Sequence, residues 1–378
     1  MRFTDEQQFI QEQVRTFAEE EIAPVAVEYE RDGTYPWDIV EQAATMDLLA
    51  PRFPETHGGA DMDLVTELLV NEELHRADPG IAETVTSITF GCESILEHGT
   101  DEQIERYVEP AIAGEKVSAV AMTEPEAGSD FGNIQATAER DGDEYVINGD
   151  KVFISNGTVA DFVVVYARTS TPDKPHRGLS AFIVESDTDG FEATPMEGFL
   201  GPSTTDLGQL FLNDVRVPVD ARLGEEGDGF YQAMEFLDEG RLNVAVSAVG
   251  AARGALELLI DYVDERQQFG GPISDNQAVR HRVANLRSRV EAARTLVYDT
   301  AQAVEGDQPV DTERVAMAKL VATTLFEEVA SEAVQLHGGY GCFDEYRVET
   351  FFRFSKIPQI YEGTNEIMRE VVGDATFN

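Results

Sequence analysis

The pattern of apolar and polar positions divides the chain into three zones. Residues 1–115 have apolar positions three or four residues apart, which predicts a mainly helical region. The first predicted helix begins at a capping box of Thr4 and Gln7 and ends before Pro24. Its apolar face consists of Phe9, Ile10, Val14, Phe17 and Ile22. Loops are expected where proline and glycine interrupt the pattern, at 51–59 and 77–80.

The second zone, residues 116–222, consists of short runs rich in β-branched and aromatic residues. Turn signals separate these runs, namely Asp141–Asp143 and the hairpin pair Asn148-Gly149. No helix of 10–15 residues is expected between them, which favours a compact antiparallel β-domain over a βαβ sheet. The predicted strands are Val117–Met122, Tyr145–Ile147, Val152–Ile154, Phe162–Tyr166, Leu179–Val184 and Leu210–Val217.

The third zone, residues 227–370, returns to long helices. An apolar stripe runs from Val244 to Val263 at 3.6-residue spacing, and similar patterns follow over 274–304 and 312–336. The stripe is broad and rich in small residues, which suits a helical bundle and an oligomer interface. The predicted fold is therefore mainly α with a central β domain. The predicted domains are an N-terminal helical domain (1–115), a middle antiparallel β-barrel-like domain (116–225) and a C-terminal helical bundle (226–378).

The net charge of the chain indicates the salt concentration in which the protein works. The formal net charge is −44, only five residues are lysine, and the carboxylates are scattered over every zone. Nucleic-acid binding is excluded because no basic stripe exists. Scattered charge of this size repels itself, and the repulsion is screened at about 1 M salt, where the Debye length is roughly 3 Å. We therefore expect adaptation to a salt-rich cytoplasm.

Several classes of site have no sequence signal. No apolar run of 18 residues or signal-peptide core is found, so a cytoplasmic protein without membrane contact is expected. Cys92 and Cys342 are far apart, and the six histidines form no HExxH, which argues against a disulfide framework or a metal site. Rossmann, P-loop and GxSxG motifs are also missing.

The most informative segment is Ile360–Arg369, IYEGTNEIMR. It places Glu362 between an aromatic residue and Gly363, whose freedom of backbone conformation favours a loop. Desolvation beside Tyr361 would raise the pKa of this carboxylate from about 4.3 toward the ~6–7 that suits a general base. An ordinary loop glutamate is the alternative when this segment is taken alone.

Two segments of the β zone carry groups that suit a polar aromatic ring. Ala121–Asp130, AMTEPEAGSD, offers backbone N–H groups and hydroxyls, although a plain turn has the same composition. Lys151–Gly157, KVFISNG, offers Phe153 for stacking and Ser155 as a hydrogen-bond donor. Burial of Phe153 in the core is the alternative.

Two segments of the last zone contain helix ends that could meet a ligand. Arg266–Gln277 leaves Arg266 at the end of a helix, before Gly270-Gly271-Pro272, where its planar fork could bind phosphate or complement the helix dipole. Gln335–Gly341, QLHGGYG, has paired glycines that allow close approach of a ligand or form a Schellman-type cap.

In this order and spacing the five segments resemble the acyl-CoA dehydrogenase family, over essentially the whole chain. The resemblance implies bound FAD, with Ser155 near the reactive N5 edge of the flavin and Glu362 as the catalytic base. The implied contacts to the chain's own FAD are Val120, Met122, Thr123, Gly128, Ser129, Phe153, Ile154, Ser155, Thr364 and Glu366. Those to the FAD of a neighbouring subunit are Arg266, Phe269, Gln277, Gln335, Gly338 and Gly339. The implied substrate contacts are Ser129, Asp238, Arg241, Tyr361 and Gly363.

The chain departs from the family pattern at a few positions. Phe153 replaces a frequent tryptophan, and Ser203 stands where an arginine usually follows the Leu-Gly pair. Some branches place the base immediately before the position of Arg241, but this chain has Gly240 there. The only evident rival to Glu362 is therefore the adjacent Glu239.

The resemblance implies α,β-dehydrogenation of an acyl-CoA to a trans-2-enoyl-CoA by a homotetramer, a dimer of dimers. An electron-transfer flavoprotein is the expected electron acceptor. The alternatives are an acyl-CoA oxidase that uses O2 and a non-catalytic flavoprotein on the same fold. Glu83–Phe90, ETVTSITF, is expected to line the acyl tail and contains no arginine for a dicarboxylic substrate. Short or medium chains, unsubstituted or branched, are favoured.

Overall fold

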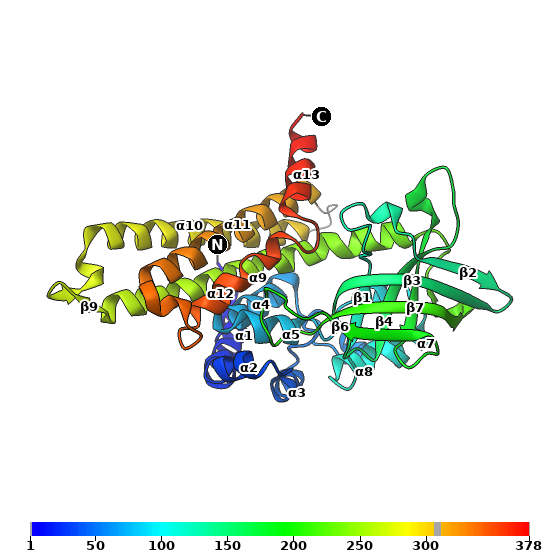
Figure 1. The fold of residues 1–378 in the computed structure, drawn as a ribbon, viewed down its shortest axis with the longest axis horizontal. Coiled ribbons are helices and arrows are strands. Elements are labelled where there is room, and N and C mark those ends of the chain that lie inside the picture. The colour runs from blue at the N-terminus through cyan, green and yellow to red at the C-terminus, as the bar shows by residue number, and fades with distance from the viewer. Residues whose placement is uncertain (1, 306–310, 378) are drawn as a thin grey trace.

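The computed structural model describes residues 2–305 and 311–377, except for the side chain of Glu239. Along the chain a β-sheet lies between two helical regions, and in space the sheet lies at one end of the molecule, on the right in Figure 1. The first region contains α1 (Asp5–Phe17), α2 (Ala26–Asp32), α3 (Trp37–Thr45), α4 (Leu64–Ala77), α5 (Pro79–Thr86), α6 (Cys92–His98), α7 (Asp101–Gln103) and α8 (Glu109–Ile112). The last region contains α9 (Gly229–Glu265), α10 (Gln277–Val304), α11 (Thr312–His337), α12 (Val348–Phe354) and α13 (Asn365–Phe377).

Local sequence signals set the ends of the N-terminal helices. The capping box predicted at Thr4 and Gln7 is present, with both reciprocal hydrogen bonds formed. The loop predicted over 77–80 was wrong, because α4 and α5 are separated by Asp78 alone. The Asp78 carboxylate accepts hydrogen bonds from the first N–H groups of α5, and Pro79 supplies the fixed φ of its first turn.

The central sheet has eight strands in the order β6-β7-β3-β2-β4-β5-β8, with β1 on β4. The predicted antiparallel domain was correct for most pairs, but β1 and β4 are parallel, and Thr137 of β2 also pairs in parallel with Arg168 of β4. The strands are β1 (Ser118–Ala121), β2 (Thr137–Asp141), β3 (Glu144–Ser155), β4 (Phe162–Arg168), β5 (Leu179–Glu185), β6 (Phe191–Pro195), β7 (Leu207–Pro218) and β8 (Arg222–Leu223).

The hairpin predicted at Asn148-Gly149 was wrong. Strand β3 continues through both residues as one strand of 12 residues paired with β7, and the register shifts between Ile147 and Gly149. Gly149 has φ 148°, and an added Cβ would meet the backbone of Ala136, so glycine here makes a bulge rather than a turn. The strands β2 and β6 were not predicted, because their polar faces are exposed.

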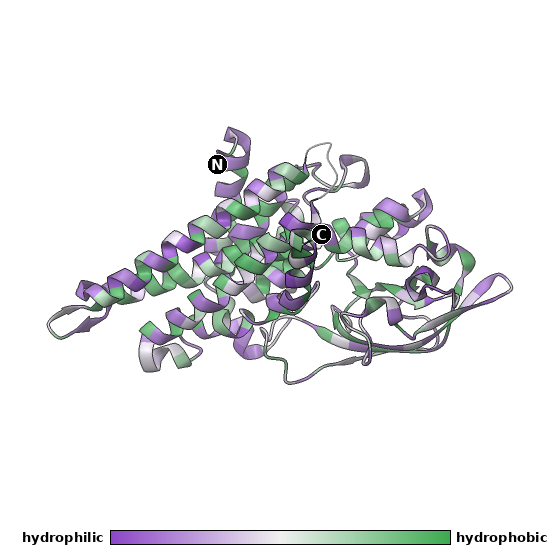
Figure 2. Ribbon diagram, turned by 90° about the horizontal axis from the view of Figure 1, so that it is seen from above, coloured by the Kyte–Doolittle hydropathy of each residue, from purple (hydrophilic) through white to green (hydrophobic). Residues whose placement is uncertain are grey.

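The long helices confirm the stripe predicted from Val244 to Val263. α9 is 37 residues long and packs against α4, α10 and α11. Hydrophobic positions face the inside of these layers and hydrophilic ones the outside (Figure 2). Among the described helices, α9 is the one long and apolar enough to cross a bilayer, but most of that stretch is buried in the protein, as in the core helix of a helical bundle.

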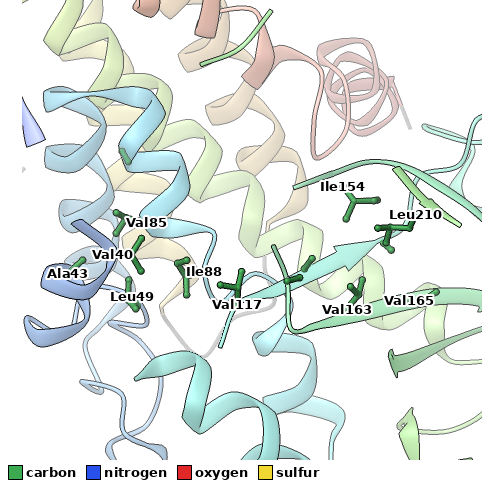
Figure 3. Packing of buried hydrophobic residues seen from close by; sticks show 14 of the residues in the cluster. Val40, Ala43, Leu49, Val85, Ile88, Val117, Ile154, Val163, Val165 and Leu210 are labelled. Carbon is green, nitrogen blue, oxygen red and sulfur yellow. The ribbon is translucent and has the colours of Figure 1, made fainter. Parts of the chain in front are cut away.

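One hydrophobic core joins the N-terminal helices to the sheet. Val40 of α3 and Val85 of α5 belong to the same buried cluster as Val163 of β4 and Leu210 of β7 (Figure 3). A second cluster joins α4 to α9, α10 and α11. The predicted fold class is thus confirmed, whereas the exact domain boundaries stay a prediction.

Candidate active site

Glu362 lies on a short loop between α12 and α13, as its glycine neighbour predicted. Both Glu362 (φ 51°) and Gly363 (φ 89°) have left-handed backbone conformations. This conformation is unfavourable for a glutamate and persists only where the surroundings hold it. Within the described residues, no group accepts a hydrogen bond from the Glu362 backbone N–H, so this donor remains available to a ligand.

The Glu362 carboxylate is buried against α9. Its Oε2 has no hydrogen-bond partner among the described residues, which is costly for a buried polar atom. An added Cβ on Gly240 would lie 3.0 Å from the carboxylate carbon, so glycine leaves the space that the base occupies. Burial raises the pKa of Glu362 to about 7; Lys319 and Arg241 oppose this rise, and Glu83 adds to it.

Two cations hold the backbone of this loop. Lys319 of α11 is fully buried, and its Nζ donates hydrogen bonds to the carbonyl oxygens of Tyr361 (2.6 Å) and Gly363. Arg241 donates through Nε to the Glu362 carbonyl oxygen at 3.3 Å. Three successive carbonyl groups are therefore bound by buried cations, which stabilises the left-handed conformation at Glu362.

Lys319 was missed by the sequence reasoning. The signal that could have found it is a lysine inside the apolar, alanine-rich face of 312–336, in a chain with only five lysines. Burial lowers the pKa of Lys319, and the Glu362 carboxylate opposes that change. A buried ammonium requires partners, and the base-bearing loop provides them.

A cavity of about 460 Å³ opens in front of Glu362. The predicted acyl segment contributes five of its residues: Glu83, Thr86, Ser87, Thr89 and Phe90. Other parts of the lining come from the loop after α3, from α4, from α6 and from α9, including Leu48, Leu49, Asn71, Leu96, Phe236, Gly240, Asn243 and Val244. An apolar chain of moderate length has space here, with its head at Glu362.

The two segments predicted to bind a ring lie side by side where the loop after β1 meets β3. The Val152 N–H donates to the Thr123 carbonyl oxygen at 3.0 Å. Beneath them the buried Lys151 ammonium binds Glu124 (2.9 Å) and the Met122 carbonyl oxygen (3.1 Å). Glu124 also accepts hydrogen bonds from the backbone N–H groups of Gln135 and Ala136. This buried ion pair fixes the shape of the 121–129 loop.

Phe153 projects outward at a bulge of β3. Its φ is 60° and 61% of it is exposed, so the alternative of a core phenylalanine was wrong. Exposing a large aromatic group in a left-handed conformation is unfavourable without a ligand to cover it. The neighbouring Ser155 is half-buried, and Ile154 points into the core.

The other predicted contacts to the chain's own cofactor differ in exposure. Val120 is buried in the core, so a ligand could reach its backbone but not its side chain. Met122 and Thr123 are half-buried, whereas Gly128 and Ser129 are exposed. Thr364 and Glu366 follow the base: the Thr364 hydroxyl accepts from the Ile367 N–H, and Glu366 pairs with Arg369 on the surface.

The residues predicted to serve a neighbouring subunit gather at the far end of α9. Arg266, Gly338 and Gly339 line a second hollow of about 490 Å³, and the Arg266 guanidinium lies over the Tyr340 ring at 5.4 Å. Phe269 is fully exposed at the tip of the small β9 (Gln267–Gln268) and β10 (Gly271–Pro272) hairpin (Figure 1). Gln277 and Gln335 are exposed nearby but do not line the hollow.

The two groups cannot meet within one chain. From Gly240 to Arg266 the helix α9 advances 26 residues, which at about 1.5 Å per residue is roughly 39 Å. A ligand at the Glu362 end is therefore far from Arg266 of the same chain.

The remaining predicted residues have structural contacts that the sequence did not show. Asp238 pairs with Arg241, and neither lines the cavity in front of Glu362. Tyr361 lines that cavity, and the Glu239 side chain lies outside the described residues. Ser203 donates from its backbone N–H (2.9 Å) and its hydroxyl (3.0 Å) to Glu30, so it ties the loop before β7 to α2.

Comparisons with known proteins agree with this geometry. Family models match residues 4–115 (acyl-CoA dehydrogenase, N-terminal domain), 119–215 (middle domain) and 227–377 (C-terminal domain). An acyl-CoA dehydrogenase of Bacillus subtilis is 38% identical over 373 residues, covering 98% of both chains. A caffeyl-CoA reductase-Etf complex subunit of Acetobacterium woodii is also 38% identical, with 98% of both chains covered. The butyryl-CoA dehydrogenase structure from Megasphaera elsdenii superimposes with a TM-score of 0.95 at 37% identity over the whole of both chains.

The chain therefore belongs to the acyl-CoA dehydrogenase family, whose members are FAD-dependent oxidoreductases. The residues present fit that cofactor. Phe153 offers an uncovered aromatic face, and Thr123 and Ser155 offer hydroxyls beside it. At the cavity, Oε2 of Glu362 has no hydrogen-bond partner within the part of the chain that the structure describes.

Proposed function

We propose that the protein oxidises an acyl-CoA thioester to its trans-2-enoyl-CoA, with Glu362 as the base. One observation carries the proposal: beside a cavity of about 460 Å³, Glu362 presents a buried carboxylate oxygen, Oε2, and a backbone N–H that both have no hydrogen-bond partner among the described residues. A base and an adjacent donor are the two groups needed to remove a proton next to a thioester carbonyl.

The chain's own residues supply the proton-transfer half of the reaction. The Glu362 N–H donates to the thioester oxygen and stabilises the negative charge that develops there. The ionised carboxylate then takes the α-proton, which requires an apparent pKa near the working pH. Lys319 and Arg241 keep the N–H and the carboxylate in fixed relation by binding the three carbonyl groups around them. Bound FAD supplies the acceptor for the hydride that leaves the β-carbon.

Replacement of the base tests this mechanism. Glu362→Gln keeps the shape of the side chain and the backbone N–H, so the variant should keep its flavin and bind acyl-CoA. Loss of a general base costs about 10²–10⁴-fold in rate. Stopped-flow flavin absorbance under saturating acyl-CoA should show this loss. Flavin reduction within a few-fold of the wild-type rate would exclude Glu362 as the base, and Glu239 would be replaced next.

An electron-transfer flavoprotein is the electron acceptor that we propose. The support is the similarity to a subunit of a caffeyl-CoA reductase-Etf complex. An acyl-CoA oxidase would instead be reoxidised by O2, so mixing the reduced enzyme with air separates the two functions. A non-catalytic flavoprotein would turn over no acyl-CoA at all.

We also propose that FAD is bound between subunits of a homotetramer. The separation of Arg266 from the Glu362 end of α9 supports this arrangement, because an anionic cofactor reached by Arg266 must belong to another chain. Arg266→Ala should lose FAD on gel filtration while keeping its helical circular dichroism. Arg140→Ala, which removes an exposed arginine from the sheet, is the matched control. Full retention of FAD by a monomeric Arg266→Ala variant would contradict the arrangement.

A further inference from the structure

The cavity in front of Glu362 has an unexpectedly acidic lining. Carboxylates from four helices, α4, α5, α6 and α9, reach it, and some are paired there: Arg52 lies 3.5 Å from Glu67, and His98 lies 3.5 Å from Glu235. Glu83 of α5 differs from these, because it lies deep in the cavity beneath the loop that carries the base.

Both contacts of Glu83 use the same carboxylate oxygen. Its Oε2 accepts from the Tyr361 hydroxyl at 3.4 Å and faces His75 Nε2 at 3.5 Å. Within the described part of the chain Oε1 accepts no hydrogen bond, and Glu83 lines the cavity that an acyl group would fill. Only 22% of the side chain is exposed.

His75 lies against the same oxygen of Glu83. Its Nδ1 lies 2.9 Å from the Asn71 carbonyl oxygen, an acceptor, so Nδ1 carries a proton. Its fully buried Nε2 has no hydrogen-bond partner among the described residues and is directed at Glu83. The ring also stacks on Phe354, with the two ring centroids 6.4 Å apart. The Tyr361 hydroxyl thus donates to Oε2 of Glu83, and the His75 ring lies against that same oxygen.

Adaptation of the surface to salt does not explain this carboxylate. That adaptation concerns exposed positions, where a carboxylate stays hydrated. Glu83 is largely enclosed, and an apolar acyl group in the cavity would remove its remaining water without replacing any hydrogen bond. Desolvating a charged group in this way is unfavourable, whereas a donor on the acyl group would compensate for it.

We propose that Glu83 recognises the acyl group, and that the substrate class is an acyl-CoA whose chain carries a hydrogen-bond donor, a hydroxyl or a protonated amino group, beyond the β-carbon. The inference rests on the proposed dehydrogenation. Phe90, Phe236 and Val244 contact the methylene groups of such a chain, and Glu83 binds its polar end. Acyl groups that end in a carboxylate are excluded by repulsion from Glu83. The short or medium chain, unsubstituted or branched, that the sequence favours is the other outcome of the test.

The test compares matched pairs of substrates. The rate of flavin reduction is measured with 4-hydroxybutanoyl-CoA against butanoyl-CoA and with 6-aminohexanoyl-CoA against hexanoyl-CoA. In each pair the ratio of kcat/KM values cancels any effect on Glu362 that both substrates share. Sites built to bind a polar group reject the analogue that lacks it strongly, so the wild-type ratio should exceed about tenfold in at least one pair. The pair of substrates with this ratio identifies the recognised donor as a hydroxyl or as an ammonium group.

Variants assign the preference to Glu83. Glu83→Met should bring the favoured ratio down to about one by lowering kcat/KM for the polar substrate and raising it for the plain one. Glu83→Gln keeps the shape of the side chain and an oxygen acceptor, so it should retain a hydroxyl preference and lose an ammonium preference. This variant replaces Glu83→Met in the test if the Met variant does not fold. Glu235→Met removes a carboxylate that is 69% exposed at the same cavity and should leave every ratio unchanged.

Two results would overturn the inference and are distinct from failure of the proposed reaction. The first is a wild-type preference for the plain acyl-CoA in both pairs. The second is a ratio in Glu83→Met that stays within twofold of the wild-type ratio. In either case the enzyme still oxidises acyl-CoA, so the dehydrogenation stands. If none of the four thioesters reduces the flavin, the proposed reaction itself fails.

Discussion

Gly240→Ala should separate the activity of this enzyme from its stability. Gly240 lies inside α9, where alanine is favoured over glycine by roughly 0.5–1 kcal/mol. The added Cβ, however, would lie 3.0 Å from the Glu362 carboxylate carbon and 3.2 Å from Oε1, and Oε2 is nearer still. Ordinary contacts begin at 3.4 Å, so the carboxylate must move.

The size of that movement gives the expected loss of activity. Relieving all three contacts requires the carboxylate to retreat by roughly 1 Å, and a misplacement of about that size can cost on the order of 10²-fold in rate. The carboxylate is the free end of a side chain, so the backbone of α9 need not move. We therefore expect a melting temperature equal to or above that of the wild type, together with a large loss of catalysis.

The assay is single-turnover flavin reduction at saturating acyl-CoA, with the melting temperature measured on the same preparation. Gly373→Ala is the matched control, because Gly373 is also helical, in α13, and an added Cβ there meets nothing within 4 Å. It should show the gain in helix propensity with an unchanged rate. Flavin reduction by Gly240→Ala within threefold of the wild-type rate would refute the assignment of this glycine as the space for the base.

Three further predictions concern charge. Because the pKa of Glu362 is raised to about 7 and only the ionised carboxylate accepts a proton, the rate of flavin reduction should rise with pH through about 7 and then level; a flat profile from about pH 5 to 9 would contradict this. Lys319→Met removes a cation that lowers the pKa of Glu362, so the midpoint of that profile should move to higher pH by about one unit. Lys174→Met, at an exposed lysine, is the control. An unmoved midpoint in Lys319→Met would exclude an effect of Lys319 on the pKa of the base. We propose a salt-rich cytoplasm for the protein, so the melting temperature should rise steeply between about 0.1 and 2 M KCl, and an unchanged value would refute salt adaptation.

Most of the fold followed from the sequence because its elements are long or have clear local ends. The stripe from Val244 to Val263 and the capping box at Thr4 and Gln7 are local signals that the structure confirms. Asn148-Gly149 shows the limit of such signals. The pair suits a hairpin turn, but strand pairing along β7 holds it inside a continuous strand.

The site was predicted only in part, because its supporting residues come from distant segments. The base on its glycine loop could be found from Ile360–Arg369 alone. The groups that hold it were harder to find: Lys319 lies 43 positions away, and its one signal is a lysine within an apolar helical face, whereas Gly240 acts by the absence of a side chain. Glu83 was included in the acyl segment, but its direction toward the cavity depends on His75 and Tyr361.

The shared hydrophobic clusters have a consequence for synthesis on the ribosome. Leu64 and Leu69 of α4 are buried with Val329 and Phe351 of α11 and α12, which are made some 280 residues later. At about 5–20 residues per second this is a delay of roughly 14–56 s, during which the apolar face of α4 lacks its partners on α11 and α12. The N-terminal helices therefore cannot complete their folding as the chain emerges, and a nascent polypeptide of this protein is a natural client for chaperones until its last helices are released.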